Sequence, residues 1–147
     1  MRGIRLASTA EPFEPGQWFQ LGIAERDTNT LIGDVGVRVA PGEKRAEVGF
    51  TLRPQSRCRG LGGEAVSELL ALLFDGVGLC EVIAITDARN LPAVRLLERV
   101  GMQRLDTTSS VFRGERCLEY LFAISRHEAD PPSPARAARQ SAERRRR

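Results

Sequence analysis

Residues 45–86 constrain the fold of this chain more than any other stretch, because they follow the pattern strand, glycine loop, helix and strand. Arg45–Leu52 (RAEVGFTL) favours a strand that Pro54 stops. Apolar side chains recur with a helical period over residues 64–74, and the apolar run EVIAIT at residues 81–86 is typical of a buried strand. Two strands joined through a helix form a right-handed parallel crossover, so this stretch predicts a βαβ unit.

The elements around this unit are predicted to pair antiparallel. Residues 18–27 alternate and end in a turn signal, which makes them the first strand of a hairpin with residues 30–40. Asn90 followed by Leu91 and Pro92 predicts a second helix with an Asn cap, closed by Gly101. Further strands are expected at residues 103–111 and 116–124. The predicted fold class is α/β (α+β): a mixed central sheet with antiparallel N-terminal strands and a βαβ unit.

Composition divides the chain into one domain and two flanking segments. A chain of 147 residues, 41% of them hydrophobic, suits a single core. Residues 1–17 contain two prolines and no sustained periodicity, so they are predicted to be irregular. Residues 18–128 form the predicted domain. Residues 129–147 have almost nothing to bury and are predicted to be a disordered, arginine-rich tail.

The charge is concentrated in that tail. Six arginines against Asp130 and Glu143 give residues 129–147 a charge of +4, so the rest of a chain with net charge +3 carries −1. This argues against a nucleic-acid-binding domain. The tail itself is either a solvated segment or a non-specific contact for RNA, ribosomes or acidic surfaces.

Other sequence signals exclude several classes of protein. No apolar run reaches the roughly 18 residues of a membrane span, and no signal peptide is visible, so a soluble cytoplasmic protein is expected. Cys58, Cys80 and Cys117 are odd in number and, with the single His127, show neither metal-ligand spacing nor a disulfide framework. We therefore expect reduced thiols and no metal site.

The glycine loop RCRGLGGEA, residues 57–65, has three physical interpretations. It satisfies G-x-G-x-x-[GA], but residues 53–59 separate the strand from Gly60, whereas the dinucleotide fingerprint starts almost directly after its strand. A plain turn explains one or two glycines and explains less well the flanking Arg57 and Arg59. A helix N-terminus already attracts anions, so glycines and arginines together favour a phosphate or pyrophosphate cradle.

The loop and a second motif carry a resemblance to a known family. Arg57-x-x-Gly60-x-Gly62 resembles the [QR]-x-x-G-x-[GA] loop of the GCN5-related N-acetyltransferase (GNAT) superfamily. NLPAVRLLERVGM, residues 90–102, resembles the superfamily's second motif, although Ala93 stands where a hydroxyl is common. Spacing and order agree over residues 18–124, and the chain looks most similar to the branch that acetylates ribosomal-protein N-termini.

The resemblance implies acetyl-CoA as co-substrate, with no metal. It implies that loop amides hold the pyrophosphate, that the pantetheine bonds a strand splayed from its neighbour, and that Asn90 contacts the pantetheine or the reactive end. The side chain of Leu61 is expected to pack in the core. The implied cofactor-binding residues are Phe50, Thr51, Leu52, Arg57, Cys58, Arg59, Gly60, Leu61, Gly62, Gly63 and Asn90.

The implied reaction is direct transfer of an acetyl group to a primary amine of a protein N-terminus or a small molecule. Glu47 matches the family's frequent strand-borne base, and the alternative for it is an exposed strand carboxylate. Tyr120 is the candidate general acid, and the alternative is a core or sheet-face tyrosine.

One departure from the family leaves a second function open. Family members begin with a strand and two helices before the segment that corresponds to Trp18, and here only 17 residues precede it. A catalytically decayed acyl-CoA-binding module is therefore the alternative to an enzyme. A homodimer is one way to cover an edge left open by missing elements.

Overall fold

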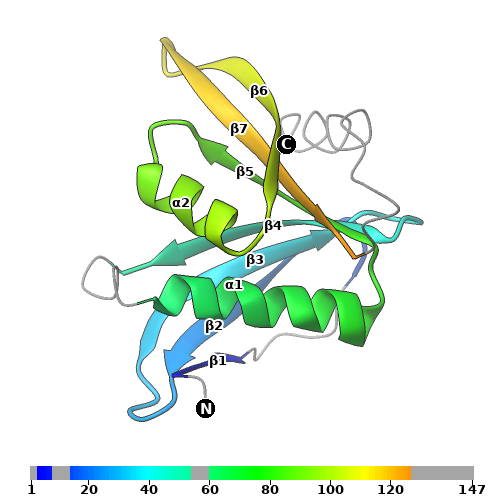
Figure 1. Cartoon of the computed structure of the whole chain (residues 1–147), viewed down its shortest axis with the longest axis vertical. Helices are drawn as coiled ribbons and strands as arrows, with labels where there is room; N and C mark the ends of the chain where they lie inside the picture. The colour runs from blue at the N-terminus through cyan, green and yellow to red at the C-terminus, as the bar shows by residue number, and fades with distance from the viewer. Residues whose placement is uncertain (1–2, 8–13, 54–59, 127–147) are drawn as a thin grey trace.

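The computed structural model describes residues 3–7, 14–53 and 60–126 of the chain. Within them, seven strands form one sheet in the order β1-β2-β3-β4-β5-β7-β6 (Figure 1). In chain order the elements are β1 (Ile4–Ala7), β2 (Trp18–Glu25), β3 (Leu31–Val39), β4 (Arg45–Leu52), α1 (Leu61–Ala71), the π-helix η2 (Leu72–Val77), β5 (Glu81–Asp87), α2 (Leu91–Arg99), β6 (Gln103–Phe112) and β7 (Glu115–Ser125).

The pairing of the strands confirms the predicted fold class. β2, β3 and β4 pair antiparallel, as do β5, β7 and β6. Among the described strands, the parallel pair is β4 with β5, the two strands that α1 connects. The predicted βαβ crossover therefore joins two antiparallel parts into one mixed sheet.

The main core lies on the sheet face that α1 and α2 cover (Figure 1). Successive side chains of a strand point to opposite faces. On β4, Ala46 and Val48 enter this core, whereas Glu47 between them points to the other face. A smaller cluster of Ile83, Leu121 and Ala123 packs on that second face. The helices thus cover the face that holds Ala46 and Val48, whereas Glu47 lies on the opposite face of the sheet.

The expectation of an irregular segment before Trp18 is wrong for Ile4–Ala7, which forms β1. This strand pairs antiparallel with β2, and Ile4 is fully buried. The amide of Gly3 donates to Glu64 Oε2 at 3.0 Å, which ties the start of β1 to the first turn of α1. Four residues hold too few alternations to show a period in the sequence, so long-range pairing defines this strand.

The helix after the glycine loop is longer at both ends than its predicted span of residues 64–74. Gly60 caps α1 with a φ of 75°, a left-handed conformation that favours glycine. Gly62 and Gly63 consequently lie inside the first turn of α1 and not in the loop. At the other end η2 continues past Gly76 and stops at Gly78, which also has a positive φ of 85°.

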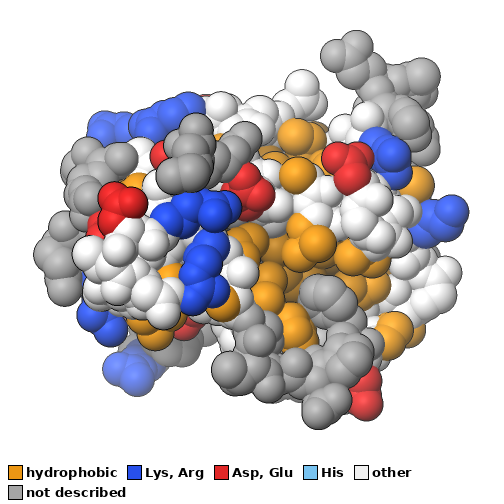
Figure 2. Space-filling model, turned by 90° about the horizontal axis from the view of Figure 1, so that it is seen from below, with side chains coloured by type: hydrophobic (Ala, Val, Ile, Leu, Met, Phe, Trp, Pro, Cys, Tyr) orange, Lys and Arg blue, Asp and Glu red, His pale blue; other side chains and the backbone are white. Residues whose placement is uncertain are grey.

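Part of the surface remains apolar. Seen from below, hydrophobic side chains gather on one side of the molecule, bordered by charged groups (Figure 2). In the described part of the chain, no helix is both long and apolar enough to cross a bilayer. The predicted tail, residues 129–147, lies outside the described residues.

Candidate functional site

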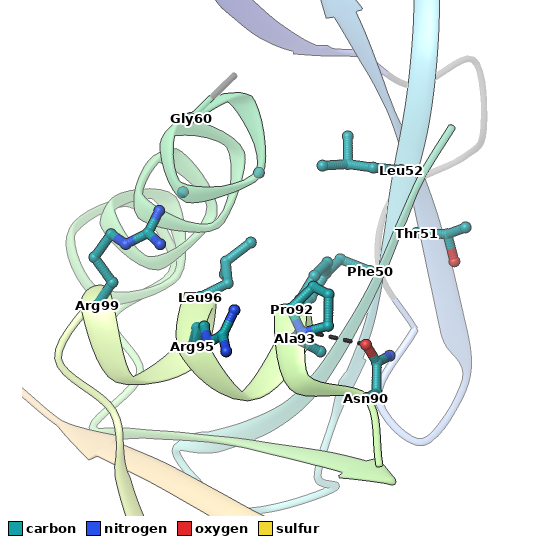
Figure 3. Close-up of a pocket in the computed structure, with 12 residues that line it drawn as sticks. Phe50, Thr51, Leu52, Gly60, Asn90, Pro92, Ala93, Arg95, Leu96 and Arg99 are labelled. Carbon is teal, nitrogen blue, oxygen red and sulfur yellow. Dashed lines mark hydrogen bonds between the residues drawn. The ribbon is translucent and has the colours of Figure 1, made fainter. Parts of the chain in front are cut away.

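A cavity of about 490 Å³ opens between the end of β4, the N-terminus of α1 and one side of α2 (Figure 3). Three sequence regions that are far apart therefore share one site. Its lining residues are Phe50, Thr51, Leu52, Gly60, Gly62, Gly63, Asn90, Pro92, Ala93, Arg95, Leu96 and Arg99. Seven of the residues that the resemblance implied as cofactor contacts are among them; Leu61 is buried in the core instead, as expected for its side chain.

The first wall is the end of β4, where the sheet opens. The ladder between β4 and β5 runs from Arg45 opposite Glu81 to Val48 opposite Ala84 and ends there. Beyond this point the two strands diverge (Figure 1). The splayed strands that the resemblance implied are therefore present in the fold.

The direction of the β4 peptide groups follows from two hydrogen bonds. The carbonyl of Arg45 accepts from Ala40, and the amide of Arg53 donates to Ile32, so odd-numbered residues of β4 direct their peptide groups toward β3. Even-numbered residues direct theirs to the opposite edge. Phe50 and Leu52 thus present N–H and C=O groups to the gap between β4 and β5.

The second wall is the glycine turn at the start of α1. Among the described residues no side chain caps this helix, so none of them supplies a capping oxygen to its first amides. A Cβ atom added to Gly60 or Gly63 would meet no atom of the described residues within 4 Å, so a side chain here would extend into space that those residues leave open. At Gly62 an added Cβ would lie 2.6 Å from Leu96 Cδ1 and 2.9 Å from Leu52 Cδ1. This glycine lets α1, α2 and β4 approach closely.

The third wall is α2, which begins at a side-chain cap. Asn90 Oδ1 accepts a hydrogen bond from the amide of Ala93 at 3.3 Å, and Pro92 lies in the first turn, as predicted. The cap uses the oxygen of Asn90 and leaves Nδ2 as the atom able to contact a ligand. Asn90 lies at the end of the cavity nearest Phe50 and Thr51 (Figure 3).

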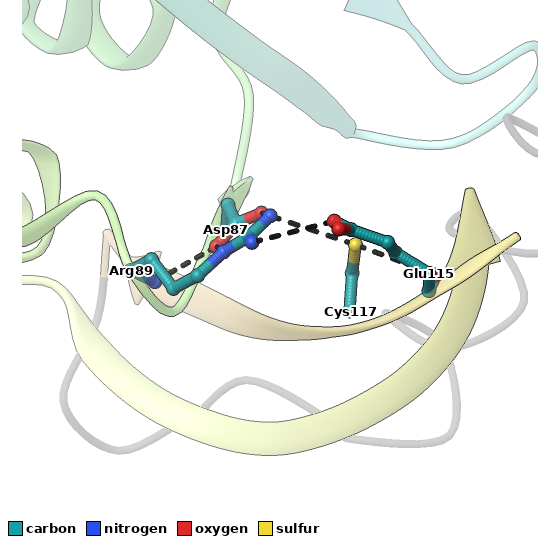
Figure 4. Close-up of polar contacts among 4 residues, drawn as sticks. All are labelled: Asp87, Arg89, Glu115 and Cys117. Atoms are coloured by element: carbon teal, nitrogen blue, oxygen red, sulfur yellow. Dashed lines mark hydrogen bonds and ion pairs between the residues drawn. The ribbon is translucent and has the colours of Figure 1, made fainter. Parts of the chain in front are cut away.

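The turn that carries Asn90 is held by an ionic cluster (Figure 4). Asp87 Oδ1 accepts from the backbone amide and Nε of Arg89, at 2.8 and 3.1 Å, and Oδ2 accepts from Nη2 at 2.9 Å. Arg89 Nη2 also lies 3.6 Å from Cys117 Sγ, and Nη1 lies 4.0 Å from Glu115 Oε2. The amide of Ala88 donates to Leu118, so the turn is fixed to β7 as well.

This cluster changes the acidity of both partners. Hydrogen bonds from Arg89 lower the pKa of Asp87 from its ordinary value of 3.8 to about 2. The hydrogen bond and charge of Asp87 in turn raise the pKa of Arg89. Both groups are therefore charged throughout the physiological range.

The two candidate catalytic side chains lie outside the cavity lining. Glu47 is only 2% exposed, so it is not the exposed strand carboxylate that was the alternative. It lies one residue before the β4–β5 ladder ends and opposite Arg38, itself 3% exposed, on β3. Tyr120 is half-buried on β7, with its ring 6.4 Å from that of Phe122 and the Arg104 guanidinium 4.3 Å above it.

The remaining predicted residues of the loop, Arg57, Cys58 and Arg59, lie outside the described part of the chain. The cavity adds five lining residues of α2 that the sequence analysis did not predict as site residues, and two of them, Arg95 and Arg99, are cationic. Their signal was present in the sequence: they are four residues apart, which places both on one face of a helix that starts at a predicted ligand contact.

Comparison with known proteins identifies the family. A family described as "Acetyltransferase (GNAT) domain" matches residues 4–103. The chain is 33% identical over 84 residues to the "Uncharacterized N-acetyltransferase YoaA" of Bacillus subtilis, covering 56% of this chain and 48% of that protein. The chain thus spans about half the length of this curated relative. It belongs to the GNAT acetyltransferase family.

Solved structures show the same fold. A GNAT-family acetyltransferase from Bacillus anthracis aligns with a TM-score of 0.68 and 26% identity, over 72% of this chain and 65% of that one. A putative ribosomal-protein-serine acetyltransferase from Vibrio cholerae aligns with a TM-score of 0.66 and 24% identity, over 74% and 64%. The second likeness supports the fold alone.

Proposed function

We propose that this chain binds acetyl-CoA in the cavity between β4, α1 and α2 and transfers the acetyl group to a primary amine. The observation that carries the proposal is the convergence of a glycine-walled helix N-terminus and a splayed strand on one cavity, in a chain of the GNAT family. The acceptor is a protein N-terminus or a small molecule. A protein N-terminus is the first to test, because the motifs of the sequence look most similar to the branch that acetylates ribosomal-protein N-termini.

The residues present fit the co-substrate. Because Gly60 and Gly63 carry no side chains, there is room for a pyrophosphate next to the first backbone amides of α1. Phe50 and Leu52 offer backbone groups to the amides of a pantetheine arm, and Asn90 Nδ2 is available at the reactive end. When bound, acetyl-CoA supplies the thioester whose acetyl group is transferred.

The chain's own groups would then supply polarisation and proton transfer. An N–H of Phe50 or Leu52 points into the gap and can donate to a carbonyl oxygen there. Glu47 lies where the ladder opens and can accept the proton of the amine. Because Glu47 is 2% exposed, we expect it to act through a water molecule.

Calorimetric titration with acetyl-CoA tests the binding half of this proposal. Gly63→Glu should abolish binding, because it places a carboxylate where the pyrophosphate would lie. Gly63→Ala is the matched control, since an added Cβ meets nothing within 4 Å, and it should bind as the wild type does. Absence of binding to the folded wild-type protein would contradict the proposal.

The rate of acetyl transfer to a panel of primary amines tests the catalytic part of the proposal. Glu47→Gln should lower the rate of acetyl transfer by roughly a hundredfold or more while leaving acetyl-CoA affinity nearly intact. Equal activity of the variant removes Glu47 from the mechanism. Binding without turnover of any amine by the wild type would support a binding module instead.

A further inference from the structure

Two guanidinium groups line the cavity from the same side of α2. Arg95 and Arg99 are one helical turn apart, and both project from α2 where it borders the cavity (Figure 3). Both side chains are exposed. Among the residues that the structure describes, neither guanidinium has a hydrogen-bond or ion-pair partner.

Helix stability does not account for this pair. Like charges at positions i and i+4 repel each other and destabilise a helix. Arg99 lies in the last turn, where a cation interacts favourably with the helix dipole. Arg95 lies in the middle of α2, and its acidic neighbour at helical spacing, Glu98, forms no ion pair with it among the described residues. A bound anion would remove the repulsion between them.

The opposite wall indicates where such an anion belongs. Gly60 and Gly63 line the cavity at the N-terminus of α1, where no described side chain accepts from the first amides, and the Arg99 side chain lies on the α1 side of the cavity (Figure 3). At 1.5 Å per residue, Arg95 and Arg99 are about 7.5 and 13.5 Å along α2 from Asn90. The cationic part of the cavity is therefore remote from the end where Asn90 and the β4 gap would hold the reacting group.

We infer that Arg95 and Arg99 bind the ribose 3′-phosphate of CoA and so make this chain select CoA over the nucleotide that lacks that group. The inference rests on the proposed function. CoA carries a pyrophosphate, which the α1 amides suit, and a separate dianionic monoester at its nucleotide end. Two guanidinium forks one turn apart match the geometry of a phosphate monoester.

The test is calorimetric titration of CoA and of 3′-dephospho-CoA, which differ only in the monoester. The wild type should bind CoA roughly ten- to a hundredfold more tightly, the range expected for charge-assisted hydrogen bonds. Arg95→Gln and Arg99→Gln should each reduce this preference by weakening CoA binding while leaving 3′-dephospho-CoA binding unchanged. Arg116→Gln, an exposed cation on β7 outside the cavity lining, is the control for net charge.

The outcomes separate this inference from the proposed function. Equal binding of both ligands by the wild type overturns the 3′-phosphate assignment while acetyl-CoA binding stands. Equal weakening of both ligands by the variants overturns it too, because the arginines would then contact the pyrophosphate. Failure of the wild type to bind either ligand overturns the proposed function and this inference with it. Thermal unfolding of each variant confirms that it is folded.

Discussion

The arginine before α2 and the two arginines along α2 have opposite surroundings. The Arg89 guanidinium donates hydrogen bonds to Asp87, and Cys117 and Glu115 lie nearby. Arg95 and Arg99 border the cavity, and the described residues provide neither with a partner. The difference shows that one stretch of eleven residues contains both a cation used to hold the fold and cations left available for a ligand.

The largest effect on CoA affinity is expected when one arginine of the α2 pair is replaced by a carboxylate that can pair with the other. Arg95→Glu places a carboxylate one turn before Arg99, an orientation that favours an ion pair within the helix. CoA affinity should fall by more than roughly a hundredfold, because one cation is lost and the other is neutralised. Calorimetry measures this, and an affinity within threefold of the wild type would show that α2 takes no part in binding.

The next effect concerns Asn90, which lies between the two groups of arginines. Asn90→Ala removes the cap of α2 and should lower the free energy of unfolding by about 1 kcal/mol. Urea denaturation measures that loss. Asn90→Asp is the matched control, since it keeps a capping oxygen and removes Nδ2. It should keep the stability and still weaken CoA binding; unchanged affinity would mean that Nδ2 makes no contact.

A smaller effect is expected at Arg89, because the ion pair with Asp87 is exposed and screened. Arg89→Gln should lower the melting temperature slightly at pH 7 and leave CoA affinity nearly unchanged. The folded pKa of Asp87, about 2, is below its unfolded value of 3.8. Its contribution is therefore present above pH 3.8 and is lost as the pH falls through 2. The melting difference between the two proteins should shrink over that range, and a constant difference would exclude the pair as its cause.

The smallest effect is on the protein without ligand. Arg95→Gln removes the like-charge pair and should raise the free energy of unfolding by about 0.2–0.5 kcal/mol. Denaturation in the absence of CoA measures the change. A decrease of similar size would show that Arg95 has a stabilising partner and would remove the contrast with Arg89.

Most of the fold followed from short-range patterns in the sequence. Residues 45–86 predicted the crossover because the periods of a helix and of buried strands are both visible there. β1 was missed because its four residues are a strand only when paired with β2. The helical period of apolar side chains begins only at residue 64 and does not place Gly62 and Gly63 in the helix, yet a left-handed Gly60 starts α1 before them.

The candidate site was less accessible to sequence reasoning. The glycine turn and Asn90 follow motifs, so their place at one cavity was predictable. The burial of Glu47 was not, because it depends on what lies over the second face of the sheet. The spacing of Arg95 and Arg99 was visible in the sequence, but the absence of a partner for either among the described residues is a property of the folded surroundings.

The opening between β4 and β5 has a consequence for the lifetime of the protein. Four residue pairs, Arg45 to Val48 with Glu81 to Ala84, join two half-sheets. A molecule that forms hydrogen bonds to both diverging strands would link them as an additional strand segment. At a free concentration of a hundred times its dissociation constant, it would stabilise the folded state by about 2.7 kcal/mol. Resistance to cellular proteases would then rise and fall with the supply of free CoA.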